Sequence, residues 1–187
     1  TISDEQIEEW KQVAVDGGVI STPSPYKITS ATTLGPVKIN CNLEISGTNY
    51  TITLRGNVWV KGDIEVGNSP TIRVDPALGN KSVVIVADDP SNPITGSEIE
   101  LQNSAVFQGS GTPGSYVMVI SQNRAAESGG SGDPAIDVKN TVSGDLLVFA
   151  PHGEILLQNA INLREVTAYK IRLKNTATVI YQTGLNN

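Results

Sequence analysis

The chain has 187 residues, only 17% of them charged, and a formal net charge of −6. This length fits one domain, and an acidic chain without a Lys/Arg cluster does not suit a nucleic-acid partner. No stretch is long and apolar enough to span a bilayer, so we expect any membrane anchor to lie upstream of Thr1, outside this sequence. The single cysteine, Cys41, allows no internal disulfide.

Residues 1–18 predict an α-helix. Ser3 and Gln6 form a capping box at its start, and acidic residues follow in the first turn, where they suit the helix dipole. The pair Gly17 and Gly18 ends the helix. Between these signals lies an apolar stripe at helical spacing, made of Ile7, Trp10 and Ala14. A stripe of this kind needs an apolar surface to pack against.

Residues 36–181 predict the coils of a single-stranded parallel β-helix. One nine-residue pattern, apolar-x-apolar-x-Asn-x-(apolar or Pro)-x-apolar, occurs in residues 64–72, 99–107, 136–144, 155–163 and 171–179. Gly144 breaks the last position of the third copy. A fixed pattern that returns at irregular intervals is typical of a solenoid whose coils share one cross-section while their loops vary. We interpret each copy as a strand, because its residues alternate between apolar and polar.

Each copy places an asparagine on the same parity as its apolar residues. These asparagines are Asn68, Asn103, Asn140, Asn159 and Asn175. A buried amide must be hydrogen-bonded, and equivalent asparagines on successive coils can satisfy one another. We therefore predict a buried structural Asn ladder. The alternative is that the asparagines mark turns, where they tolerate a left-handed backbone.

A second series of apolar runs lies between these copies, at residues 58–63, 83–88, 116–121, 146–151 and 166–171. Each coil therefore has at least two strands. The alternation of the first run, carried forward, places on the outside Val84, Val86, Val117, Val119, Leu147, Phe149 and Tyr169. A contiguous apolar surface of this size is usually covered. We predict that the N-terminal helix covers it, with Ile7 and Trp10 against Val84, Val117 and Leu147.

Two loop-rich interruptions, residues 88–97 and 122–134, follow strands of this second series and should emerge on one edge of the solenoid. Long loops in compact domains are often functional. Their candidate ligand residues are Asp88, Asp89, Asn92 and Asp133. Oxygen donors of this kind suit calcium, but adjacent acids in a loop are usually solvated. We predict neither a metal site nor a cofactor.

The outward positions of the Asn-bearing strands carry three stacked acids, Glu65, Glu100 and Asp137, followed by Leu156 and Arg172. Stacked carboxylates could serve an enzyme that cleaves glycans. Their neighbours, however, form an ordinary mixed surface. The one histidine, His152, follows a proline and is expected to be a solvent-facing turn residue. The sequence therefore predicts no catalysis.

The sequence offers two further candidate binding surfaces. Trp59 and Tyr169 have outward parity and could stack on a sugar, but both fall on the face assigned to the helix. Thr51 and Thr53 begin an outward threonine array of the kind that binds ice, and nothing in the sequence continues it. Neither surface therefore supports a function.

Three phrases of the sequence, residues 43–47, 58–66 and 147–159, resemble the extracellular β-helical domain of PilX-like type IV pilus-associated proteins. The resemblance covers about residues 36–181, and the sequence departs from that family by placing Asn where the family more often has Gly. It implies a β-helix displayed outside a bacterial cell. Bactofilins, which are cytoskeletal β-helices, are a neighbouring alternative with more regular coils and no long loops.

We therefore expect one domain over residues 1–187, an all-β parallel β-helix with one N-terminal α-helix packed alongside. The expected function is that of a non-catalytic bacterial surface or pilus-associated module for adhesion, binding or assembly. Its expected partners are other surface or pilus proteins, or a glycan. The alternative is a secreted carbohydrate-binding or carbohydrate-active protein.

Overall fold

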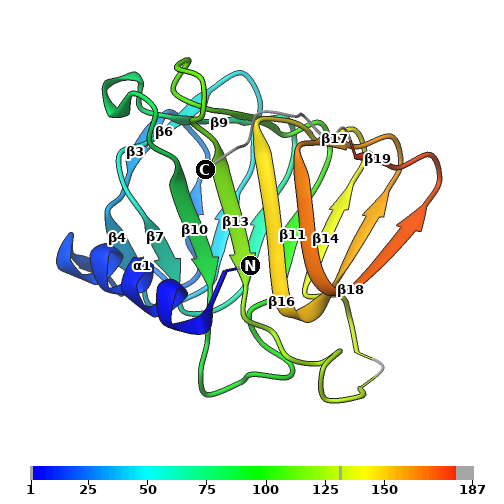
Figure 1. Ribbon diagram of the computed structural model, residues 1–187. Coiled ribbons are helices and arrows are strands. Elements are labelled where there is room, and N and C mark those ends of the chain that lie inside the picture. Colours follow the sequence, from blue (N-terminus) through cyan, green and yellow to red (C-terminus); the bar gives the residue numbers. More distant parts are fainter. Residues whose placement is uncertain (1, 131, 180–187) are drawn as a thin grey trace.

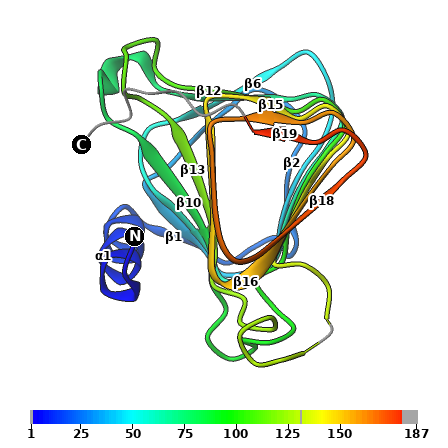
Figure 2. The ribbon, with the colours of Figure 1, turned by 45° about the vertical axis from the view of Figure 1, so that its right-hand side comes forward.

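The chain forms a parallel β-helix with one α-helix alongside (Figures 1 and 2). The computed structural model describes residues 2–130 and 132–179. Successive coils pair in parallel, and most coils contain three strands separated by turns. The strands therefore form three faces, and Figure 2 shows these faces as the sides of a triangle.

The first face contains β1 (Val19–Ile20), β4 (Val37–Ile39), β7 (Val58–Val60), β10 (Val83–Ala87) and β13 (Val117–Ser121). The second face contains β2 (Tyr26–Ile28), β5 (Leu43–Ile45), β8 (Ile64–Val66), β11 (Ile99–Leu101) and β14 (Ile136–Lys139). Two long strands turn the corner and belong to both of these faces, β16 (Leu146–Gln158) and β18 (Glu165–Lys174).

The third face is a separate seven-stranded sheet. Its strands are β3 (Thr32–Leu34), β6 (Thr51–Leu54), β9 (Thr71–Val74), β12 (Val106–Gln108), β15 (Ser143–Gly144), β17 (Asn162–Leu163) and β19 (Thr178–Val179). A short 3-10 helix, η1 (Pro76–Leu78), follows β9. The first coil thus begins at β1, well before residue 36, where the sequence predicted the coils to start.

Rows of aliphatic side chains fill the interior of the β-helix. On the second face, Ile64, Ile99, Ile136 and Ile155 stand in register on successive coils, and each is at most 3% exposed. Period-2 alternation sends these residues inward and the intervening polar residues outward. Burying a side chain of this size contributes about 1.5–3 kcal/mol relative to leaving it in water. Stacked aliphatic rows are therefore the main source of the stability of the coils.

The sequence predicted that each copy of the nine-residue pattern forms a single strand, and this prediction is wrong. In residues 64–72 it contains β8, a turn at Asn68 and Ser69, and the start of β9. The alternation continues across the turn because both strands point apolar residues into the same interior. Sequence periodicity alone therefore hid the corner between the second and third faces.

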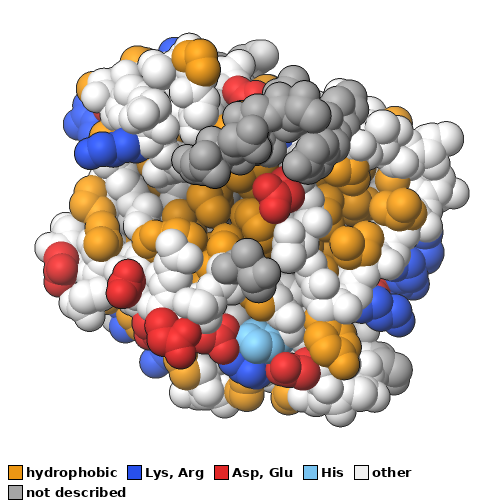
Figure 3. All heavy atoms as spheres, viewed as in Figure 1, with side chains coloured by type: hydrophobic (Ala, Val, Ile, Leu, Met, Phe, Trp, Pro, Cys, Tyr) orange, Lys and Arg blue, Asp and Glu red, His pale blue; other side chains and the backbone are white. Residues whose placement is uncertain are grey.

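The N-terminal helix α1 (Asp4–Asp16) packs outside the first face, as predicted. Ser3 caps it by accepting a hydrogen bond from the backbone N–H of Gln6. Its inner side is formed by Ile7, Lys11 and Ala14, whereas Trp10 is half-buried. Figure 3 shows hydrophobic side chains gathered over the first face beside the helix.

The apolar surface next to α1 agrees with the prediction at Val84, Val86, Leu147 and Phe149, and it differs on strand β13. Ile7 packs with Val84, Val86, Ile120, Leu147 and Phe149. Val117 and Val119 instead point into the interior, and they stand beside Val83 and Ile85 on the neighbouring strand. Strand β13 is apolar on both sides, so its alternation carried no information on which side faces inward. Tyr169 was also predicted under the helix, but it lies in β18 and is 59% exposed.

A buried cation fastens the helix to the first face. The Lys11 side chain is 4% exposed, and its Nζ lies 2.6 Å from Asp88 Oδ2 and 2.7 Å from Glu8 Oε1. The same Nζ lies 4.3 Å from the centre of the Trp59 ring, and Trp59 Nε1 donates to the carbonyl oxygen of Asp88. Helix, strand β7 and the end of β10 thus meet at one ammonium group.

The two long loops lie on the same edge of the β-helix, as predicted (Figures 1 and 2). Asn123 is fully buried between them, and its Nδ2 donates to the carbonyl oxygens of Ile94 and Gly96 at 2.9 and 2.8 Å. Across the described residues, no helix has the length and apolar character needed to cross a membrane.

Candidate functional site

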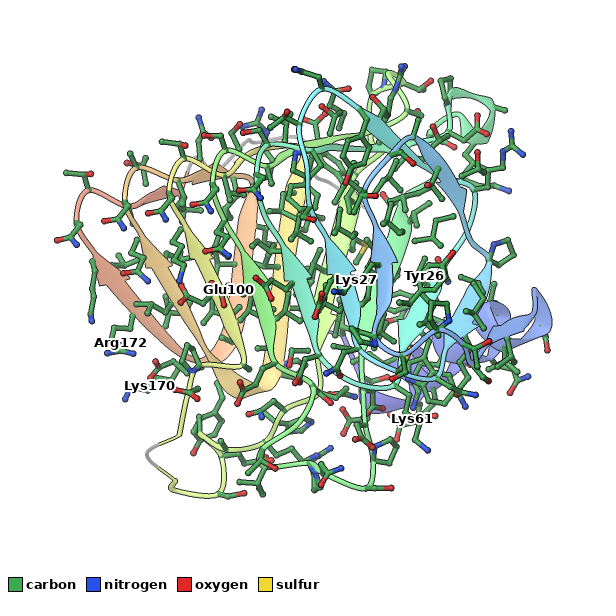
Figure 4. All side chains as sticks on the ribbon, turned by 180° about the vertical axis from the view of Figure 1, so that it is seen from behind. Tyr26, Lys27, Lys61, Glu100, Lys170 and Arg172 are labelled. Carbon is green, nitrogen blue, oxygen red and sulfur yellow. The ribbon has the colours of Figure 1, made fainter. Side chains whose placement is uncertain are left out.

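The outer side of the second face carries a row of charged residues in register. Glu44, Glu65, Glu100 and Asp137 stand side by side on β5, β8, β11 and β14. Lys27 precedes this row, and Leu156 and Arg172 follow it. Figure 4 shows Lys27, Glu100 and Arg172 on this face. Adjacent parallel strands lie about 4.8 Å apart, so these acids are close neighbours.

A groove of about 430 Å³ follows the acidic row, and further carboxylates line its edge. Its acids are Asp63, Glu98 and Asp133 in addition to Glu44, Glu65, Glu100 and Asp137. Burial raises the pKa of Glu98, and the charges of Asp133 and Asp63 add to this effect. Asp63 also accepts a hydrogen bond from the backbone N–H of Glu98. The groove is therefore a strongly negative surface on a rigid support.

Neighbouring coils supply partners for the middle of the row. Lys139 Nζ lies 3.0 Å from Glu100 Oε1 and 3.6 Å from Asp137 Oδ2. The contact with Glu100 raises the pKa of Lys139, so the ammonium stays charged. Gln158 Nε2 donates to Asp137 Oδ1 at 3.0 Å. This arrangement can hold a cationic partner by charge, but it keeps its central acids in ion pairs.

The sequence predicted Glu65, Glu100 and Asp137 as a stack, and the structure brings them together as described. The sequence-based prediction missed Glu44, Asp63 and Glu98, and it named Asp133 as a loop residue but not as part of this groove. The strand that carries Glu44 has Gly47 where the nine-residue pattern has Asn, so it lies outside that pattern. Its apolar-x-apolar spacing, Leu43-Glu44-Ile45, was the signal that could have found it.

The asparagine ladder exists at the corner between the second and third faces, but it is not buried as predicted. Asn68, Asn103 and Asn175 are exposed, and Asn140 and Asn159 are half-buried. All five adopt a left-handed backbone, with φ between 50° and 62°. Asparagine tolerates this conformation better than most residues. The alternative prediction, that these asparagines mark turns, is therefore confirmed.

Side-chain amides nevertheless bond from coil to coil. Asn140 Nδ2 donates to Asn103 Oδ1 at 3.1 Å, and Asn159 Nδ2 donates to Asn140 Oδ1 at 2.8 Å. The next residue in each turn adds a hydroxyl row, in which Ser104 and Thr141 share a hydrogen bond of 2.6 Å. The corner is therefore a polar, regularly spaced edge that lines a shallow groove.

We expect Asn140→Gly to lower the free energy of unfolding by about 1–2 kcal/mol, because two amide hydrogen bonds are lost. Asn140→Ala should cost about 1 kcal/mol more, because alanine is strained in the left-handed conformation. Urea denaturation of both variants measures the difference. Equal losses would contradict a role for backbone conformation at this turn.

The candidate loop residues do not converge on one site. Asp88 is buried and bound to Lys11, whereas Asp89 accepts from the backbone of Ser91 and from Asn92 Nδ2. Asp133 lies at the edge of the acidic groove. Among residues 2–130 and 132–179, no group of three or more His, Cys, Asp or Glu side chains is placed to hold a metal ion.

The structure corrects the prediction that His152 is a solvent-facing turn residue. His152 lies in β16, and its side chain is 16% exposed. Its Nε2 lies 2.9 Å from Asp4 Oδ1 on α1, and its Nδ1 lies 2.9 Å from Glu127 Oε2 in the second long loop. Arg124 contacts both acids at 3.2 Å. This polar cluster ties the start of the helix to the loop.

The hydrogen bond from His152 lowers the pKa of Asp4. The pKa of Asp4 is lower in the folded protein than in the unfolded chain, so Asp4 stabilises the fold at any pH above the unfolded-state pKa. This stabilisation is lost as the pH falls through the folded-state pKa. We therefore expect the unfolding free energy to fall on acidification below about pH 4, and to fall less in Asp4→Asn. Urea denaturation from about pH 2.5 to 6, a range that spans the unperturbed Asp pKa of about 3.9, measures this change. Asp16→Asn, at the exposed end of α1, is the control, and identical acid sensitivity of all three proteins would contradict the expectation.

The threonine array extends further than the sequence suggested. Thr71 stands beside Thr51, and Thr33 stands beside Thr53. The row through Thr71 then continues with Val106, Ser143, Asn162 and Thr178. Because these residues differ in size and polarity, the third face is not a uniform threonine surface.

Comparison of the chain with protein-family models, with curated proteins and with solved structures gave no match.

Proposed function

We propose that this chain is a non-catalytic binding or assembly module of a protein displayed outside a bacterial cell, in a pilus-associated setting. The phrases that resemble PilX-like domains support this proposal. Residues 58–66 contain β7 and β8, and residues 147–159 follow β16 around its corner. The phrases therefore coincide with the strands that build the coils. The expected partner is another surface or pilus protein.

The observation that carries the non-catalytic part is the pairing of the stacked acids. Glu100 and Asp137 both contact the charged Lys139, and Asp137 also accepts from Gln158. A general acid needs a carboxyl group that holds its proton near the working pH. An adjacent ammonium favours the ionised carboxylate instead. Glu100 and Asp137 are thus better suited to charge recognition than to proton transfer.

An activity screen tests this part. The purified protein and its Glu100→Gln variant are incubated with plant, bacterial and algal polysaccharides, and new reducing or unsaturated ends are measured. We expect no turnover by either protein. Turnover by the unchanged protein that drops about 100-fold or more in Glu100→Gln would show acid-base catalysis and contradict the proposal.

Protease treatment of intact cells tests the location. The bacterium that carries the gene is treated before lysis, and the chain is detected with an antibody beside a cytoplasmic marker protein. We expect the chain to be degraded while the marker survives. Survival of both would place the chain inside the cell and contradict surface display.

A further inference from the structure

Within residues 2–130 and 132–179, the β-helix is open at its C-terminal end. In the last coil, Ile171 and Leu173 point toward the interior but are 48% and 59% exposed. Their neighbours in the same rows, Ile155 and Leu157, are fully buried. The exposure therefore comes from the position of this coil at the end of the stack. Figure 2 shows it wrapped around the corner between the first and second faces.

The other end of the solenoid is better covered, although Ile20 and Tyr26 of the first coil, which also point inward, are half-buried. Ile28 and Leu34 belong to the first coil, yet they are only 3% and 4% exposed. Solenoids need a polar terminal coil or a cover at each end to keep their core from water. The two ends of the described solenoid thus differ in degree, and its C-terminal end presents the apolar residues Ile171 and Leu173 on its surface.

Strand β18 also has a free edge. Among the described residues it pairs with β16 alone, so one row of its backbone N–H and C=O groups is available to another strand. An edge of this kind is a template for pairing with a second chain. The apolar side chains and the backbone groups at this end therefore call for the same kind of partner, which is another coil.

The last coil has two strand segments, one on each side of a corner, and a two-fold axis can pair each segment with the other segment of a second copy. Residues 165–168 lie on the first face with Val166 and Ala168 pointing inward, and residues 171–174 lie on the second face with Ile171 and Leu173 pointing inward. A two-fold axis through the corner, between residues 169 and 170, places each segment opposite the other segment of a second copy. Val166 then faces Leu173 of the second copy, and Ala168 faces its Ile171.

The same axis pairs opposite charges. Glu165 comes to lie opposite Lys174 of the second copy, and symmetry repeats this pair. Within residues 2–130 and 132–179 neither residue forms an ion pair, and Glu165 accepts only from Thr167. The other cations of the strand, Lys170 and Arg172, are already held by Glu154 at 3.3 and 2.9 Å. Opposite charges across neighbouring strands stabilise their pairing.

Head-to-tail stacking lacks this complementarity. If the first coil of a second copy followed β18, the charged row of the second face would place Lys27 beside Arg172. Like charges directly opposite each other on neighbouring strands are destabilising. The charge pattern therefore favours a closed pair of C-terminal ends over an open filament.

We propose that the chain forms a two-fold symmetric dimer through its C-terminal coil, with β18 pairing antiparallel to β18 of the second copy. The dimer buries Ile171 and Leu173 and joins Glu165 to Lys174 twice. This inference rests on the geometry of the last coil and does not depend on the proposed function.

Light scattering after size-exclusion chromatography tests the dimer. We expect a particle of twice the 19.8 kDa chain mass. Lys174→Glu should weaken association about tenfold or more, because two attractive pairs become two repulsive ones. The charge swap Glu165→Lys with Lys174→Glu should restore the dimer. Lys81→Glu, an exposed change in a distant loop, is the matched control and should leave it intact.

Cross-linking gives a second readout that does not depend on charge. The axis places Thr167 opposite Arg172 of the second copy, so Thr167→Cys with Arg172→Cys should form a covalent dimer on oxidation. Thr167→Cys with Lys174→Cys pairs no opposed positions and should stay monomeric. A monomeric unchanged protein, a dimer unaffected by Lys174→Glu, or cross-linking of both cysteine pairs alike would overturn the proposal.

Discussion

Gly144→Ala is expected to lower the free energy of unfolding by about 4–5 kcal/mol, or to prevent folding altogether, which is the range of exceptional single substitutions. Gly144 lies in β15 with φ +124°, and a Cβ built there would lie 1.9 Å from the carbonyl oxygen of Phe107 on the neighbouring coil. The backbone of β12 would have to move to make room. Urea denaturation followed by far-ultraviolet circular dichroism measures the loss.

Gly18→Ala is the matched control for this substitution. Gly18 has nearly the same φ, +128°, but its Cβ would meet nothing within 4 Å. Alanine there should cost only the backbone strain, about 1–3 kcal/mol. If Gly18→Ala and Gly144→Ala lose the same stability, the contact between coils adds nothing and the explanation fails.

Lys11→Met should lower the free energy of unfolding by about 3–5 kcal/mol, because it leaves a buried carboxylate without its partner. The Asp88 side chain is 12% exposed, and Lys11 is its ion-pair partner among the described residues. The substitution also removes the contact between the ammonium and the Trp59 ring. Urea denaturation monitored by tryptophan fluorescence reports both the stability and the state of this contact.

A double-substitution cycle separates the pair from its surroundings. If Lys11 and Asp88 act as a pair, Lys11→Met combined with Asp88→Asn should cost less than the two single losses added together. Lys61→Met, at an exposed lysine, should stay within about 0.5 kcal/mol of the unchanged protein. Simple additivity in the cycle would show that the buried pair does not hold the helix.

Much of the architecture could be predicted from the sequence, because alternation and the returning Asn are local signals. Strand β8 shows this, since Ile64 and Val66 point inward as their spacing indicates. The parity of β13 could not be predicted, because both of its sides are covered and both are therefore apolar. The corner at Asn68 was missed because alternation continues through it.

The charged contacts were harder to predict than the strands. The stack of Glu65, Glu100 and Asp137 follows from their equivalent places in the repeat. Lys11 and Asp88, by contrast, are 77 residues apart and share no pattern. His152 likewise meets Asp4 across 148 residues. Such contacts depend on where the helix rests on the first face, which single-chain periodicity does not encode.

The Asn turn gives the molecule one constant edge and leaves the other two variable. At the corner marked by Asn103, Asn140 and Asn159 the chain turns in the same way on each coil. The interval from Asn140 to Asn159 is nevertheless about half of that from Asn103 to Asn140, and the difference lies in residues 109–116 and in the long loop of residues 122–134, on the two other edges. Such a frame lets a gene lengthen, shorten or exchange loops at the variable edges while every coil still closes. Sequence diversity among descendants of this chain should therefore accumulate at those edges and spare the turn.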